Sequence, residues 1–139
     1  MLRHPLDVVL SVFSNRLTHG FYCSYALETA ARHFARVMDL VERYRSEMTL
    51  HYLPVRYEDI VDGQEESVRR MLDFIGAPFD PSCLQFQENR RYARTASYAQ
   101  VTERLYDSSR YRHRHYLKEL EPVVPTLESL IKRLGYAVD

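Results

Sequence analysis

Residues 2–11, Leu-Arg-His-Pro-Leu-Asp-Val-Val-Leu-Ser, constrain the fold most, because they combine a helix start with a helical apolar period. Pro5 suits the first turn of a helix, where a missing backbone N–H costs nothing. Asp7 falls in the same turn, where a carboxylate suits the positive end of the helix dipole. The spacing predicts a helix over about residues 5–18. Its predicted buried stripe consists of Leu6, Leu10, Phe13 and Leu17.

A polar stripe with the same spacing accompanies the apolar one and consists of Asp7, Ser11, Ser14 and Thr18. Arg3 stands just ahead of the predicted helix. A guanidinium offers a planar fork of donors, and the first N–H groups of a helix have no helical partner, so together they can hold a phosphate. Spacing alone nevertheless favours the simpler interpretation of a solvated arginine and a surface serine.

The pattern Arg3-x-Pro5-x-Asp7-x-x-x-Ser11 resembles the 3′-phosphate-binding motif of sulfotransferases that use 3′-phosphoadenosine 5′-phosphosulfate (PAPS). In that family an arginine and a serine eight residues later grip the 3′-phosphate of the cofactor. Residues 55–60 resemble the family's strand-to-helix segment. Residues 88–97 and 108–109 resemble the bacterial branch that is often fused to tetratricopeptide repeats. These segments follow the family's order across nearly the whole chain.

The resemblance implies a nucleotide site. It implies that Arg3 and Ser11 bind the 3′-phosphate of PAPS, or of its product adenosine 3′,5′-bisphosphate. Tyr57 matches a tyrosine that lines the adenine pocket, and its place after a predicted strand suits a ligand site. A half-buried packing tyrosine is an equally good interpretation.

A later loop is implied to close over the nucleotide, with contacts from Thr95, Ser109 and Arg110. The family often has Arg-Lys-Gly where this chain has Ser108-Ser109-Arg110, so the match is looser here. The arginines and histidines of residues 110–115 also fit a solvated helix start; we favour a role for part of them in binding the cofactor or acceptor, because anionic ligands need such clusters.

The implied reaction is transfer of a sulfuryl group from PAPS to an acceptor hydroxyl or amine. The family's 5′-phosphosulfate loop and its usual general base lie early in the domain, and neither has a counterpart here. The sequence has four glycines and no Gly-rich phosphate loop, so we assign no catalytic residue.

We therefore expect a single domain over residues 1–139 that is the C-terminal half of an α/β P-loop-like sulfotransferase fold. Such a half could be a truncated product, a deliberately cut piece or one part of a two-chain assembly. Alone it is expected to be inactive and to form a homodimer or bind a partner that supplies the missing half.

The expected secondary structure is mainly α with one short strand region. A strand is predicted over residues 50–56, where Pro54 would remove a ladder hydrogen bond. A long loop is predicted over residues 87–111. The other predicted helices span residues 25–47, 64–75, 112–120 and 125–134, and a short one begins at Asp80-Pro81.

Composition limits the alternatives. The 19 basic and 19 acidic residues cancel, so no global field attracts nucleic acid or a membrane, and any anion site must be local. The class that competes with a sulfotransferase is a non-catalytic helical module that binds a nucleotide or nucleic acid through the Tyr- and Arg-rich residues 90–114. An inert helical interaction domain is a third.

The remaining expectations concern metal, cysteines and location. The histidine spacing predicts no metal site. The separated Cys23 and Cys83 indicate two buried, reduced thiols in a cytoplasmic protein. No apolar run approaches the roughly 18 residues of a membrane span. Asp7 interrupts the first apolar run, so we do not expect a signal peptide there.

Overall fold

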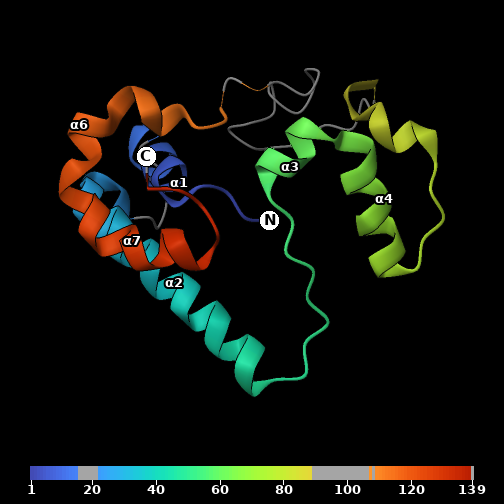
Figure 1. Cartoon of the computed structure of the whole chain (residues 1–139), viewed down its shortest axis with the longest axis horizontal. Helices are drawn as coiled ribbons and strands as arrows, with labels where there is room; N and C mark the ends of the chain where they lie inside the picture. The colour runs from blue at the N-terminus through green and yellow to red at the C-terminus, as the bar shows by residue number, and fades with distance from the viewer. Residues whose placement is uncertain (16–21, 89–106, 108, 139) are drawn as a thin grey trace. The chain divides into compact units, whose positions relative to one another are not determined.

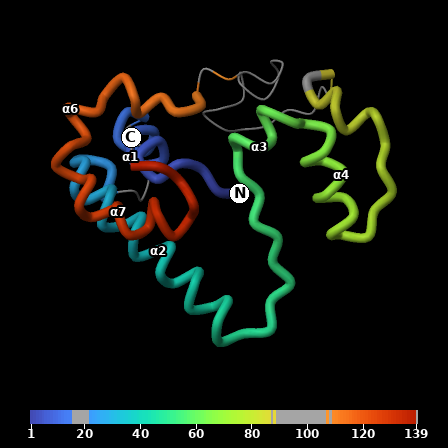
Figure 2. Tube along the Cα trace, in the orientation of Figure 1, coloured from blue at the N-terminus to red at the C-terminus, as the bar shows by residue number. Residues whose placement is uncertain are grey.

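The computed structural model describes residues 1–15, 22–88, 107 and 109–138 (Figure 1). The described chain is mainly helical, as expected. It divides into two compact units, whose chain paths can be followed in Figure 2. The first unit contains residues 1–2 and 53–109, and the second contains residues 3–52 and 110–139. The single domain expected from the sequence stays a prediction.

The second unit is built on three helices, α1 (Pro5–Ser14), α2 (Leu27–Glu47) and α7 (Val124–Arg133). Helix α2 packs against both α1 and α7 (Figure 1). Apolar side chains of these three helices form one core with side chains from just before and just after α7. The core consists of Leu6, Val9, Ala30, Ala31, Leu120, Val123, Leu127, Leu130, Ile131 and Tyr136. The predicted helix over residues 25–47 is confirmed as α2 to within two residues.

The predicted helix at residues 5–18 is confirmed at its start but ends earlier than expected. Ser14 is its last residue and Asn15 its C-cap. The Asn15 side chain donates to the Ser11 carbonyl oxygen at 2.9 Å. Asparagine side chains compete in this way with backbone donors, and this competition favours the end of a helix. Phe13 is 38% exposed rather than buried, and Val9 takes its place beside Leu6 and Leu10. Leu17 and Thr18 lie outside the described residues.

The strand expected over residues 50–56 is wrong apart from its last residue. Leu2 and Arg56 form a parallel bridge, in which Leu2 N–H donates to Val55 O at 2.6 Å and Tyr57 N–H donates to Leu2 O at 2.8 Å. Residues 51–55 form no strand or helix. Pro54 has no N–H to offer a neighbouring strand, so the ladder cannot continue through it.

Short helices complete the first unit. They are α3 (Tyr57–Asp62), α4 (Gln64–Ile75), η2 (Pro81–Leu84) and η3 (Phe86–Glu88). Gly76 ends α4 with a left-handed φ of 71°, the conformation that glycine adopts most readily. Asp80 caps η2 as predicted, because its Oδ1 accepts from Ser82 N–H at 2.8 Å.

The predicted helices at 112–120 and 125–134 are confirmed in outline. The first is divided into η4 (Arg112–Tyr116) and α6 (Leu117–Leu120), and the short η5 (Glu121–Val123) leads into α7. Most of the loop expected over residues 87–111 lies outside the described residues. Cys83 is exposed and Cys23 only half-buried, so the expectation of two buried thiols is wrong. Among the described helices, none has an apolar stretch that could cross a bilayer.

Candidate functional site

The start of α1 is held by a histidine. His4 is the N-cap residue, and its Nδ1 accepts from Leu6 N–H at 3.3 Å. Its Nε2 lies 2.9 Å from the carbonyl oxygen of Ala137. A carbonyl can only accept, so the ring proton is on Nε2 and Nδ1 is the acceptor. Two fixed partners therefore select one neutral tautomer of this buried ring.

This cap changes one expectation from the sequence. The first N–H groups of the helix were expected to meet a phosphate, but Pro5 has none and Leu6 N–H is taken by His4. Val8 N–H bonds to His4 O at 3.1 Å. An anion at this end of α1 must therefore be held largely by side chains.

Asp7 is the centre of a buried polar cluster in the second unit. Its Oδ1 accepts from His113 N–H at 2.7 Å and from His113 Nδ1 at 2.9 Å. Its Oδ2 lies 3.6 Å from Arg3 Nη2. The side chains of Asp7 and His113 are both 0% exposed. The carboxylate therefore lies between Arg3 and His113, and His113 is 106 positions later in the sequence than Asp7.

The surroundings of Asp7 keep it ionised. Burial by itself raises the pKa of this carboxyl group. The hydrogen bonds from the His113 side chain and backbone, together with the charge of Arg3, outweigh that effect and hold the pKa below its ordinary value of 3.8. Asp7 is thus a charged, paired group at neutral pH.

Aromatic rings extend the cluster to residues 110–114. The rings of His4 and His113 stack with centroids 3.9 Å apart and an interplanar angle of 14°. The Tyr111 ring meets both edge-on at 6.2 and 6.1 Å. Tyr111 has a left-handed φ of 51°, which costs a non-glycine residue energy and persists only when its surroundings enforce it. The guanidinium carbons of Arg110 and Arg114 lie 5.8 and 4.6 Å from the centroid of its ring.

Three of the predicted site residues lie in this unit. Arg3 is mostly buried, with 22% of its side chain exposed. Ser11 is half-buried on α1, and its Oγ accepts from Asn15 Nδ2 at 3.2 Å. Asp7 and Ser11 are four residues apart and so share a helix face. Arg110 is half-buried beside Tyr111.

The other predicted residues are placed separately. Tyr57 and Ser109 belong to the first unit and are half-buried. Tyr57 directly follows the bridged Arg56 and begins α3, as expected for a residue after a strand end. Thr95 lies outside the described residues.

Sequence reasoning missed His4, Tyr111 and His113 as parts of the cluster. The position of His4 directly before Pro5 marks it as an N-cap, but histidine is not among the preferred capping residues. Nothing in the local sequence reveals that Asp7 pairs with His113, because that contact depends on tertiary packing.

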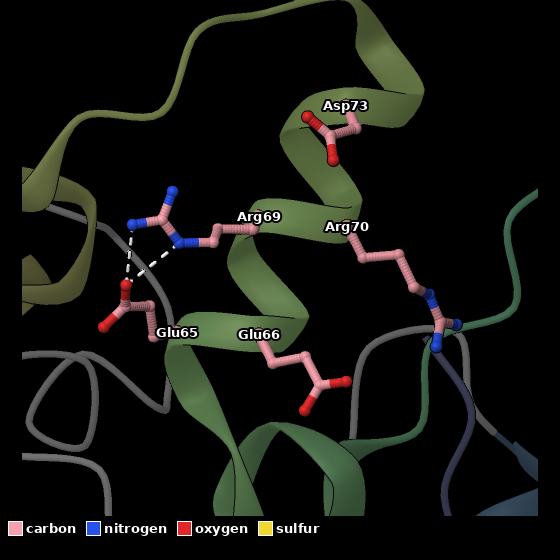
Figure 3. A pocket seen from close by; sticks show the side chains of 5 residues that line it. All are labelled: Glu65, Glu66, Arg69, Arg70 and Asp73. Carbon is pink, nitrogen blue, oxygen red and sulfur yellow. Dashed lines mark hydrogen bonds and ion pairs between the residues drawn. The ribbon is translucent and has the colours of Figure 1, made fainter.

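Two hollows of the described structure have linings that do not match an anionic nucleotide. Glu65, Glu66, Arg69, Arg70 and Asp73 line a shallow one on α4, and Figure 3 shows that acidic side chains alternate with the arginines. In the second unit, a cavity of about 300 Å³ is lined mainly by apolar residues of α1, α2, η4 and α6, among them Phe13 and Tyr116. Within the described ranges, no three His, Cys, Asp or Glu side chains gather closely enough to hold a metal ion.

Comparison with known proteins supplies the family. The model of the sulfotransferase family matches residues 1–81. An uncharacterized protein of Aquifex aeolicus (strain VF5) is 33% identical over 78 residues, which are 56% of this chain and 10% of that protein. The match thus spans about a tenth of the relative's length. The residues matched by the family model include Arg3, α1 with Ser11, the bridge at Arg56, and helices α3 and α4. Because the match covers more than half of the chain, the chain belongs to the sulfotransferase family.

Proposed function

We propose that the start of α1 holds the 3′-phosphate of PAPS, and that the protein serves transfer of a sulfuryl group to an acceptor hydroxyl or amine. One observation carries the proposal. The Arg3 guanidinium lies against Asp7, and Ser11 follows Asp7 by one helical turn on the same face of α1. The two side chains of the expected motif are thus directed to one face of one helix.

The chemistry asked of these residues is positioning and charge neutralisation. Sulfuryl transfer leaves a nucleotide bisphosphate, and fixed donors on its 3′-phosphate orient the donor molecule for an in-line reaction. Arg110 would add a second guanidinium from the same unit. No described residue is assigned to bond breaking, so we expect the 139-residue chain alone not to turn over PAPS.

The adenine side of the site is proposed from the resemblance. Tyr57 would line the adenine pocket, and Thr95 and Ser109 would belong to the segment that closes over the nucleotide. We further propose that the chain is the C-terminal half of a domain of the bacterial, tetratricopeptide-repeat-associated type. Self-association, or a partner that supplies the phosphosulfate-binding residues, belongs to the same proposal; a molar mass of one chain by light scattering would count against self-association.

Calorimetric titration tests the proposal with adenosine 3′,5′-bisphosphate and adenosine 5′-monophosphate, which differ only in the 3′-phosphate. We expect the bisphosphate to bind more tightly, and Arg3→Ala to weaken it by at least about tenfold, as loss of a charge-assisted contact does. Affinity for the monophosphate should stay unchanged.

The matched control is Arg69→Ala, which removes an exposed arginine from a similar pair with Glu65 on α4 and should alter neither affinity. Equal affinity of the wild-type protein for both nucleotides would contradict the proposal. Tighter binding of a single-stranded oligonucleotide than of the bisphosphate would favour the nucleic-acid-binding alternative.

A further inference from the structure

We infer that Asp7 is a positioning residue, which fixes the Arg3 guanidinium and, through His113, holds the basic segment 110–114 beside the start of α1. The inference rests on the proposed 3′-phosphate site and adds to it the group that arranges the site. Asp7 itself is not expected to touch the phosphate.

The first argument is that hydrogen bonds to one carboxylate oxygen, Oδ1, fix the Asp7 side chain and leave Oδ2 beside Arg3. Its Oδ1 accepts two hydrogen bonds from His113, one from the backbone and one from the ring. The His113 ring is stacked on His4, and His4 is bonded to Leu6 N–H and Ala137 O. A carboxylate held in this way can act as a rigid support, in the manner of the outer groups that orient the ligands of a binding site.

The second argument concerns charge. Arg3 and Asp7 together carry no net charge, so the pair supplies directed N–H donors but little long-range attraction for a phosphate. Arg110, Arg112 and Arg114 supply that attraction. The bonds between Asp7 and His113, together with the stacking of His113 on His4, join this positive segment to the start of α1 in the second unit.

The third argument is the strained backbone of Tyr111. Tyr111 has a left-handed φ and lies in the sequence between Arg110 and Arg114, whose guanidinium groups are both near its ring. Two residues later, His113 is anchored to Asp7. Strain of this kind is sustained by surrounding contacts, and here the contacts are those that set the position of the arginines.

The test uses Asp7→Asn. An asparagine keeps the shape and one acceptor for His113, but it presents an uncharged group to Arg3. We expect the preference for adenosine 3′,5′-bisphosphate over adenosine 5′-monophosphate to fall about tenfold, the lower range seen when an outer supporting group is lost. Affinity for the monophosphate should be unchanged. If Asp7 had a purely structural role, the substitution would reduce both affinities, or the fraction of protein able to bind. The ratio of the two affinities would then stay unchanged.

Glu65→Gln is the control, because it makes the same chemical change in an exposed carboxylate paired with Arg69. We expect it to leave the ratio at the wild-type value. An unchanged or increased ratio for Asp7→Asn, in a wild-type background that does prefer the bisphosphate, would overturn the inference but not the proposed function. Equal affinity of the wild-type protein for the two nucleotides would instead contradict the proposed function.

A pair of His113 variants tests the link to the basic segment. His113→Asn retains a side-chain donor for Asp7 and should keep most of the preference. His113→Phe retains a ring to stack on His4 but loses the donor, and should lower the preference toward that of Asp7→Asn. If the phenylalanine variant kept the wild-type ratio, the link through His113 would be wrong.

Discussion

Two arginine–carboxylate pairs in this protein share a four-residue spacing but have opposite surroundings. In the second unit, Arg3 pairs with Asp7, whose side chain is 0% exposed. In the first unit, Arg69 pairs with Glu65 at 2.7 Å, and their side chains are 50% and 56% exposed (Figure 3). The shorter distance belongs to the pair that contributes less, because water and mobile ions screen exposed charges. Spacing and distance are therefore poor guides to what an ion pair does, and burial is the better one.

The largest effect expected from this comparison is on stability. Asp7→Ala removes the acceptor for two buried donors of His113, and should lower the free energy of unfolding by about 3 kcal/mol. Glu65→Ala should change it by less than about 0.5 kcal/mol. Urea denaturation followed by circular dichroism measures both. Equal losses in the two variants would mean that burial does not separate the pairs.

A smaller effect is expected from pH, because protonation removes the charge of Asp7 but leaves its side chain in place. The pKa of Asp7 is lower in the folded protein than its ordinary value of 3.8. Its contribution to stability is therefore complete above about pH 3.8 and is lost as the pH falls through the folded pKa. Between about pH 5 and pH 2, the unfolding free energy should fall more steeply in the wild type than in Asp7→Asn.

Asp80 serves as the control for that experiment. Its pKa is also lowered, chiefly by the hydrogen bond from the Ser82 backbone. Asp80→Asn should leave intact the part of the pH dependence that Asp7→Asn removes. Parallel curves for the wild type and Asp7→Asn would show that the buried carboxylate does not titrate as described.

The smallest effect is expected for Glu65→Gln, which leaves the Arg69 guanidinium in place over the Phe79 ring, 3.6 Å from its centroid. Glu65→Gln should change the unfolding free energy by less than about 0.5 kcal/mol, and the difference should shrink further in about 1 M salt. The same salt should leave most of the Asp7→Ala effect in place, since that carboxylate is shielded from solvent. A large, salt-independent loss in Glu65→Gln would contradict the contrast between the pairs.

Local sequence signals predicted the helices well, because capping residues and apolar periods act within a few residues. Pro5 marked the start of α1, and Asp80 marked the start of η2. The strand over residues 50–56 failed because β pairing depends on a distant partner and on backbone N–H groups, and Pro54 lacks one. Phe13 was assigned to the core by period alone, although packing selected Val9.

The proposed site could be derived from the sequence only where a short motif points to it. Arg3 and Ser11 could be proposed because their spacing matches a family pattern, and their role stays a prediction. The roles of Asp7, His113 and His4 could not, since each depends on contacts between residues more than 100 positions apart. An acidic residue in the first turn of a helix is ordinarily explained by the helix dipole. Because this explanation is sufficient for Asp7, nothing in the local sequence gave a reason to expect a tertiary contact.

The cap on α1 has a consequence for the order in which contacts form during folding. His4 has one partner two positions away, Leu6 N–H, and another, the carbonyl oxygen of Ala137, 133 positions away. Loop closure over such a span precedes any gain from the contact and slows its formation. The cap at the start of α1, beside Arg3, therefore gains its second partner only after two segments 133 positions apart have met.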